Sequence, residues 1–140
     1  MTYAEPAKVR ILLIDSAPDA LNQLQRLLES KDYEVIAVQT GGEGLVYLGR
    51  QCPDVVLADL VLPDMTGIEL LKQIKTKDAQ MQVFLMGTRI TPALICESIR
   101  SGAVELLYKA FVACSIIHKI EYLLSHDPRV GCNGDRKKSA

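Results

Sequence analysis

Charged or polar residues stand at the ends of four of the five apolar runs in this sequence. Asp15 ends the first run, Asp59 ends the third, Gly87 and Thr88 follow the fourth, and Lys109 ends the fifth. Singly, each has a common structural role, because an aspartate after a strand usually serves a turn or caps a helix, and a lone lysine is usually solvated. If the runs are parallel strands, however, their carboxyl ends meet at one edge of a sheet. The two carboxylates and the ammonium would then converge on one site.

The order of the apolar and helical segments predicts such a sheet. Five short runs rich in Val, Ile and Leu alternate with segments of helical period, which is typical of a parallel sheet with helices on both faces. We therefore predict an α/β fold with a doubly wound, five-stranded parallel sheet. The second run is short and flanked by polar residues, which favours an edge, whereas the third is apolar on both faces, which favours the centre. The predicted strands are VRILLID (9–15), YEVIAV (33–38), DVVLAD (54–59), MQVFLM (81–86) and AVELLYK (103–109).

The segments between these runs have the spacing of amphipathic helices. In the first segment four leucines form one apolar stripe, and Pro18 is well placed in the first helical turn. Gly102 stands where the end of a helix favours a left-handed residue. The four leucines are Leu21, Leu24, Leu27 and Leu28, and further helices are predicted at 41–50, 66–77, 91–101 and 112–125.

Length and composition fit one cytoplasmic domain. A chain of 140 residues can bury enough apolar surface to fold without disulfides or a structural metal. The net charge of -1 gives no overall attraction to nucleic acid or to a membrane surface, and no apolar run approaches the roughly 20 residues that cross a bilayer. The four cysteines lie far apart, which indicates thiols in a reducing compartment. We predict a folded domain over residues 1–125 and a tail, or the start of a linker, over 126–140.

Two segments resemble the receiver domain of bacterial two-component response regulators. DVVLADLVLPDMTGIELL, residues 54–71, is similar to the family's central strand, acceptor aspartate, Pro-containing loop and Gly-led helix. SGAVELLYKAF, residues 101–111, is similar to its helix end, fifth strand and lysine. The resemblance covers residues 8 to about 125. It implies a flavodoxin-like (βα)5 fold with strand order 2-1-3-4-5, and a phosphoryl acceptor at Asp59.

The resemblance also implies a role for each residue at the predicted edge. A carboxylate that holds a phosphoryl group brings several negative charges together, so the site needs a divalent cation and a fixed ammonium. Lys109 would pair with the acceptor and its phosphoryl group, and the backbone N-H of Thr88 would donate to that group. Asp64, in the loop after the third strand, is either a water-mediated contact to the metal or a turn residue. The implied ligands of Mg²⁺ are Asp15, Asp59 and the backbone carbonyl of Val61.

Four positions depart from the family's pattern. Ser16 stands where the family has a second acid, the more direct metal ligand, so we expect a weakened Mg²⁺ site to which Ser16 contributes little. Gly87 replaces a Ser or Thr whose hydroxyl moves onto the phosphoryl group, and Leu106 replaces an aromatic that changes rotamer. Ala110 replaces the proline that follows the lysine through a cis bond. Because a cis bond before a residue other than proline costs about 2.5–4 kcal/mol, the Lys109-Ala110 bond is predicted to be trans, or cis under strain.

Two functions are compatible with these residues. The first is a signalling domain, not an enzyme beyond its own phosphorylation and dephosphorylation, that takes a phosphoryl group onto Asp59 from a sensor histidine kinase or a phosphotransfer protein. The second is a phosphorylation-independent pseudo-receiver that acts as a protein-protein interaction module, and the four departures favour it. In either case an effector domain or a second copy would bind the face made by the fourth helix, fifth strand and fifth helix, with no direct contact to nucleic acid.

A third class, an aspartyl-nucleophile phosphohydrolase or a flavin-binding protein, does not fit the sequence. Such hydrolases favour an Asp-x-Asp pair, but Leu60 and Val61 follow Asp59. No phosphate-binding loop rich in Gly, Ser and Thr follows the first run, because SAPDAL leads directly into the predicted helix.

Overall fold

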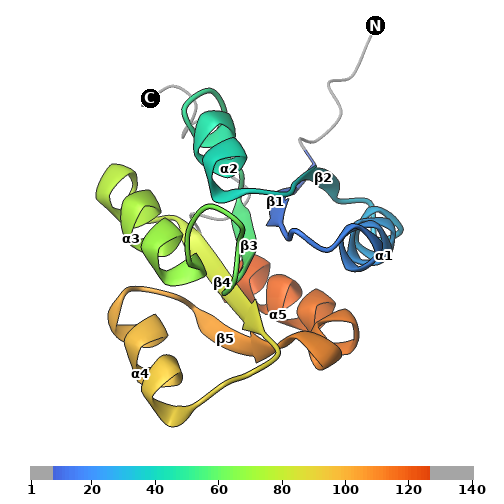
Figure 1. Ribbon diagram of the computed structural model, residues 1–140. Helices are drawn as coiled ribbons and strands as arrows, with labels where there is room; N and C mark the ends of the chain where they lie inside the picture. Colours follow the sequence, from blue (N-terminus) through green and yellow to red (C-terminus); the bar gives the residue numbers. More distant parts are fainter. Residues whose placement is uncertain (1–7, 127–140) are drawn as a thin grey trace, which may run out of the picture.

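A computed structural model describes residues 8–126 of the chain. Strands and helices alternate along the chain, as the sequence predicts (Figure 1). The strands are β1 (Arg10–Ile14), β2 (Glu34–Val38), β3 (Val55–Asp59), β4 (Gln82–Gly87) and β5 (Glu105–Tyr108). The helices are α1 (Pro18–Glu29), α2 (Gly41–Leu48), α3 (Gly67–Lys77), α4 (Pro92–Arg100), a short 3-10 helix (Lys109–Phe111) and α5 (Val112–His126). The predicted tail falls outside the described residues except for His126, which still belongs to α5.

The five strands form one parallel sheet in the order β2-β1-β3-β4-β5, which confirms the predicted fold class and strand order. The second strand lies at an edge and the third at the centre, as their sequences indicate. In the register, Ile14 pairs with Ala58, and Asp59 pairs with Met86. The strand ends that carry the candidate residues therefore lie at one edge of the sheet.

Two apolar cores, one on each face of the sheet, hold this arrangement. The alternation of side chains along a strand sends Ile11 and Leu13 of β1 to the core that α1 and α5 cover. Leu12 and Ile14 go to the opposite core, which contains the apolar face of α3. Figure 1 shows α1 and α5 on one side of the sheet and α2 and α3 on the other. Because both faces are covered, the central strands can be apolar throughout.

The bounds of α2, α3 and α4 differ slightly from the predicted ranges. Helices α3 and α4 each begin one residue later than predicted, because the residue before each helix acts as its N-terminal cap. The hydroxyls of Thr66 and Thr91 accept hydrogen bonds from the backbone N-H of Glu69 and Leu94, so these threonines precede α3 and α4. Helix α2 ends at Leu48. Gly102 has φ +106°, as expected for the end of α4. None of the helices in the described part of the chain is both long and apolar enough to cross a membrane.

The loop between β3 and α3 returns closely onto the end of β3. The backbone N-H of Gly67 donates to the carbonyl of Leu60 at 2.7 Å, and that of Leu60 donates to Met86 of β4 at 2.8 Å. A Cβ atom at Gly67 would meet the backbone of Asp59 and Leu60, which has no room to move aside. This glycine therefore allows α3 to begin directly against the end of β3.

Substitution of Gly67 by alanine is expected to lower the free energy of unfolding by about 1–3 kcal/mol, because the added methyl group would force the two backbones apart. Urea denaturation followed by circular dichroism measures this change. Gly49→Ala is the matched control, because Gly49 is exposed with φ -72° and a Cβ there would lie 3.4 Å from its nearest neighbour. Equal stability of Gly67→Ala and the control would contradict this account.

Candidate functional site

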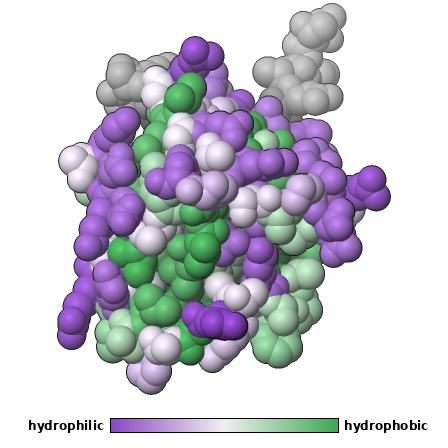
Figure 2. Space-filling model, in the orientation of Figure 1, coloured by the Kyte–Doolittle hydropathy of each residue, from purple (hydrophilic) through white to green (hydrophobic). Residues whose placement is uncertain are grey.

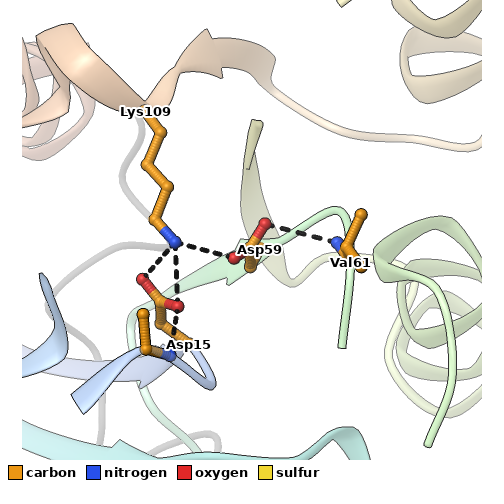
Figure 3. A network of polar contacts seen from close by, with 5 residues as sticks. Asp15, Asp59, Val61 and Lys109 are labelled. Carbon is orange, nitrogen blue, oxygen red and sulfur yellow. Dashed lines mark hydrogen bonds and ion pairs between the residues drawn. The ribbon is translucent and has the colours of Figure 1, made fainter. Parts of the chain in front are cut away.

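Lys109 joins the two aspartates that the sequence singles out. Its Nζ lies 2.8 Å from Oδ2 of Asp59 and 2.9 Å from both carboxylate oxygens of Asp15. Figure 3 shows the lysine reaching from the end of β5 between the carboxylates that end β1 and β3. The predicted convergence of these three side chains is thus present in the structure, across 94 and 50 residues of sequence.

Burial makes this contact strong. Asp15 is 1% exposed and Asp59 is 8% exposed, so neither carboxylate is surrounded by water. Burial lowers the pKa of Lys109, but its hydrogen bonds to Asp59 and Asp15 outweigh that effect and raise the pKa above its usual value. The ammonium is therefore charged at neutral pH. Two carboxylates and one ammonium leave a net negative charge at the site, which favours a cation or another positive group.

Backbone N-H groups fix the orientation of both carboxylates. The N-H of Ala17 donates to Oδ1 of Asp15 at 3.0 Å, and the N-H of Val61 donates to Oδ1 of Asp59 at 3.2 Å. These contacts place the Val61 main chain beside the predicted acceptor (Figure 3). Each aspartate thus uses one oxygen to hold its own loop and also contacts Lys109.

The end of β4 has no side-chain hydroxyl at Gly87, where the family has a Ser or Thr. A Cβ at Gly87 would lie 2.6 Å from Cδ1 of Leu60, so the leucine side chain fills the space where a Ser or Thr side chain would begin. Leu60 is buried, and Thr88 is exposed one residue beyond the strand. Sequence reasoning noted that Gly87 lacks a hydroxyl but missed that Leu60 occupies its place. No local pattern could have indicated this, because the contact joins two neighbouring strands.

Two further predictions concern Ala110 and Asp64. The peptide bonds of the described residues include no cis bond, which confirms the trans Lys109-Ala110 bond, and Lys109 still reaches both carboxylates. Asp64 does not point to the metal site: its two oxygens accept the backbone N-H groups of Gly41 and Gly42 at 3.0 and 2.8 Å. Of the two roles left open for Asp64, the structure therefore supports a structural contact in the loop.

A cleft opens beside these residues, between α3 and α4. Its volume is about 740 Å³, and Ser16, Asp59 and Lys109 are among the residues that line it. Figure 2 shows apolar side chains gathered on this face of the molecule, over the region between these two helices. The cleft gives the acceptor end of the sheet an open approach. Its other lining residues are Leu60, Val61, Thr66, Ile68, Glu69, Lys72, Gly87, Thr88, Arg89, Leu94 and Glu97.

Comparison with known proteins identifies this arrangement. The family described as "Response regulator receiver domain" matches residues 11–121 of the chain. The chain belongs to the response regulator receiver domain family. The receiver domain is 28% identical over 117 residues to the chemotaxis protein CheY of Bacillus subtilis (strain 168), covering 83% of this chain and 98% of that protein. It is 32% identical to the transcriptional regulatory protein MctR of Rhizobium johnstonii, covering 84% of this chain and 56% of that longer protein.

Solved structures agree with this assignment. A crystal structure of a CheY-like response regulator receiver domain protein from Methanospirillum hungatei JF-1 superposes with a TM-score of 0.81 at 28% sequence identity. The superposition covers 85% of this chain and 95% of that one. Receiver domains of this family are signalling modules of two-component systems, and the family generally binds Mg²⁺ in an acidic pocket.

The donor groups of this receiver domain fit Mg²⁺, with fewer charges than a full acidic pocket. Mg²⁺ is usually bound through one or two carboxylates, with water completing an octahedron. Asp15 and Asp59 supply two buried carboxylates, and the Val61 main chain lies beside that of Asp59. No group of three or more His, Cys, Asp or Glu side chains that could hold a metal occurs within residues 8–126. Ser16, which also lines the cleft, supplies a neutral hydroxyl where a third carboxylate could stand.

Replacing Ser16 by aspartate is expected to increase the affinity for Mg²⁺ by about 10-fold or more, because it adds a charged oxygen beside two existing carboxylates. Isothermal titration with MgCl₂ measures the change, and Ser16→Asn is the control that alters the side chain without adding charge. If the aspartate and asparagine variants bind Mg²⁺ equally, Ser16 does not lie at the metal site.

Proposed function

We propose that this receiver domain accepts a phosphoryl group on Asp59 from a sensor histidine kinase or a phosphotransfer protein in the cytoplasm. The observation that supports this most is the position of the Lys109 ammonium, within hydrogen-bonding distance of Asp59 and Asp15 at once. Such a charge at the acceptor is what an acyl phosphate requires, because the group brings additional negative charge into a buried place. The cleft beside Asp59 gives a donor access to the carboxylate.

In this proposal, an oxygen of Asp59 attacks the phosphorus atom, a bond forms between them, and the bond from phosphorus to the donor breaks. Lys109 then exchanges part of its contact with Asp59 for a phosphoryl oxygen. Asp15 keeps the lysine in place, since Nζ also bonds to that carboxylate. The N-H of Val61 continues to orient Asp59. The backbone N-H of Thr88, a residue that lines the cleft, would donate to the phosphoryl group.

Mg²⁺ would supply the remaining positive charge at this site. Asp15, Asp59 and the backbone carbonyl of Val61 would hold it, with a minor contribution from Ser16. Because one acid is replaced by Ser16, we infer that phosphorylation requires a higher Mg²⁺ concentration than in a receiver with two adjacent acids. The receiver then works as a signalling domain whose only chemistry is its own phosphorylation and dephosphorylation.

The alternative is a pseudo-receiver that binds protein partners without phosphorylation. The packing of Leu60 against Gly87 favours it, because this contact leaves no hydroxyl that could follow the phosphoryl group. Leu106, half-buried in β5, likewise offers no aromatic ring to change position. These features concern how phosphorylation would be read, whereas Asp59 and Lys109, the residues on which phosphorylation itself would depend, are in contact. We therefore favour phosphoacceptance.

Incubation of the receiver with phosphoramidate and saturating MgCl₂ is expected to increase its intact mass by one phosphoryl group. The increase should disappear in the Asp59→Asn variant, because the nucleophilic carboxylate is replaced by an amide. Asp32→Asn is a matched control, since it makes the same substitution at an exposed carboxylate that precedes β2, at the edge of the sheet opposite Asp59. A wild-type protein that gains no mass from phosphoramidate or from a cognate kinase would exclude phosphoacceptance and leave the pseudo-receiver.

We further propose that α4, β5 and α5 form the face that binds an effector domain or a second copy. Ile95 and Ile99 of α4 and Tyr108 of β5 are exposed, although they are large and apolar. Beside them, Lys119 of α5 and Glu105 of β5 form an ion pair with Nζ-O distances of 2.8 and 2.9 Å. An apolar strip next to charged groups is typical of a protein interface.

Substitution of Ile99 by aspartate is expected to weaken self-association of the phosphorylated receiver by about 10-fold or more, because a charge would be buried in the apolar strip. Sedimentation velocity with phosphoramidate and MgCl₂ measures the association, with Val46→Asp on α2 as the control at another exposed aliphatic residue. A phosphorylated wild type that stays monomeric would exclude a second copy and assign the face to an effector domain.

A further inference from the structure

The loop that leaves the acceptor is a small hairpin with Asp64 near its tip. Val61 and Thr66 form an antiparallel bridge, and the N-H of Leu62 donates to the carbonyl of Met65 at 3.2 Å. The Val61 side chain is 74% exposed, so side-chain packing contributes little to holding this residue. The position of the Val61 main chain therefore depends on the hydrogen bonds of the loop at its base and at its tip.

The tip of this hairpin is bonded to the first turn of α2. The Asp64 carboxylate accepts from the N-H of Gly41 at 3.0 Å and from that of Gly42 at 2.8 Å. The next N-H of the helix, that of Glu43, donates to the hydroxyl of Thr40 at 3.1 Å. Asp64 thus completes the N-terminal cap of a helix that lies 22 and 23 residues before it. The backbone N-H groups of Gly42 and Gly41 hold the pKa of Asp64 below its usual value, although desolvation opposes them.

The two glycines are fitted to this contact by a second, independent feature. A Cβ at Gly41 would lie 2.6 Å from the sulfur of Met65, and a Cβ at Gly42 would lie 3.1 Å from an oxygen of Asp64. A side chain at Gly41 would have to displace the Met65 side chain, and one at Gly42 would leave less room for the Asp64 carboxylate that accepts its N-H. The pair Gly41-Gly42 therefore permits the close approach of the loop, in addition to beginning α2.

We propose that Asp64 is a positioning residue for the metal site: it clamps the hairpin to α2 and thereby holds the Val61 main chain beside Asp59. The proposal rests on the proposed function, in which the Val61 carbonyl binds Mg²⁺. Because the site has two carboxylates in place of three, its affinity for Mg²⁺ would depend more strongly on a Val61 carbonyl oxygen that is already in position. Asp64 would hold the Val61 carbonyl in position without contacting the metal.

The clamp has a reciprocal consequence. If the bond between Asp64 and α2 favours the loop position that binds Mg²⁺, then Mg²⁺ binding must stabilise that bond by the same factor. The N-H groups of Gly41 and Gly42 should therefore respond to Mg²⁺, although they belong to another helix. Their response should follow the same binding curve as the N-H groups of Val61 and Ala17 at the site.

The test is a titration of the full chain with MgCl₂ alone, followed by two-dimensional ¹H-¹⁵N NMR. In the wild type, the Gly41 and Gly42 signals should shift with the dissociation constant measured at Val61. Asp64→Ala, which removes both hydrogen bonds, should weaken Mg²⁺ binding by about 10-fold, a typical loss for a residue that orients a metal ligand. Asp64→Asn keeps one acceptor oxygen, so its dissociation constant for Mg²⁺ should lie between those of the wild type and Asp64→Ala.

Thr40→Ala is the control for a merely structural effect. It removes the other cap of the same helix end and lowers stability, but it leaves the hairpin bonded to α2. Thr40→Ala is expected to lower thermal stability about as much as Asp64→Ala does. Its dissociation constant for Mg²⁺ should nevertheless stay within about twofold of the wild-type value, because the hairpin remains bonded to α2.

The outcomes separate the two proposals. A wild-type Mg²⁺ affinity that Asp64→Ala leaves unchanged would overturn the clamp alone, as would equal losses in Asp64→Ala and Thr40→Ala. A wild type that shows no response to Mg²⁺ at Val61 and Ala17 would overturn the metal-dependent function, and the role of the clamp with it. The clamp would be established if Asp64→Ala, but not Thr40→Ala, loses Mg²⁺ affinity, and if the wild-type Gly41 and Gly42 signals shift with the same dissociation constant as that of Val61.

Discussion

The contact of the Lys109 ammonium with two buried carboxylates is the interaction on which the rest of the site depends. Asp15 and Asp59 would repel each other at the end of an apolar sheet, and burying either charge alone would be costly. Lys109 offsets both costs, but only because β1, β3 and β5 end at the same edge in parallel register. The two apolar cores hold that register. Sheet order, burial and charge therefore act together to place the Asp59 carboxylate beside a fixed positive charge.

The fold and the central triad of residues could be predicted because both follow from regular patterns. Strand-helix alternation indicated the parallel sheet, and the position of Asp15, Asp59 and Lys109 at strand ends indicated that they meet. Two other features could not be predicted. Leu60 fills the space above Gly87, and the Asp64 carboxylate caps a helix 22 residues earlier in the chain. Both depend on side-chain packing across elements, for which a single sequence has no periodic signal.

The departures at Ser16, Gly87, Leu106 and Ala110 affect different parts of the molecule. Under the proposed function, Ser16 would lower the negative charge available to Mg²⁺, whereas Gly87 and Leu106 would lack the groups that report the phosphorylation of Asp59. Ala110 leaves the contacts of Lys109 intact, since the lysine reaches both carboxylates through a trans bond. The acceptor is thus preserved while its surroundings have changed. The hairpin that carries Asp64 connects the loop after Asp59 to the beginning of α2.

A crystal structure of the protein grown with MgCl₂ and beryllium trifluoride, a mimic of the phosphoryl group, tests the central claim most directly. Our account predicts beryllium trifluoride bonded to an Asp59 oxygen, Mg²⁺ in contact with Asp15, Asp59 and the Val61 carbonyl, and Lys109 bonded to a fluorine atom while it keeps Asp15. An unmodified Asp59 at saturating concentrations of both reagents, with Lys109 still bonded to both carboxylates, would contradict it.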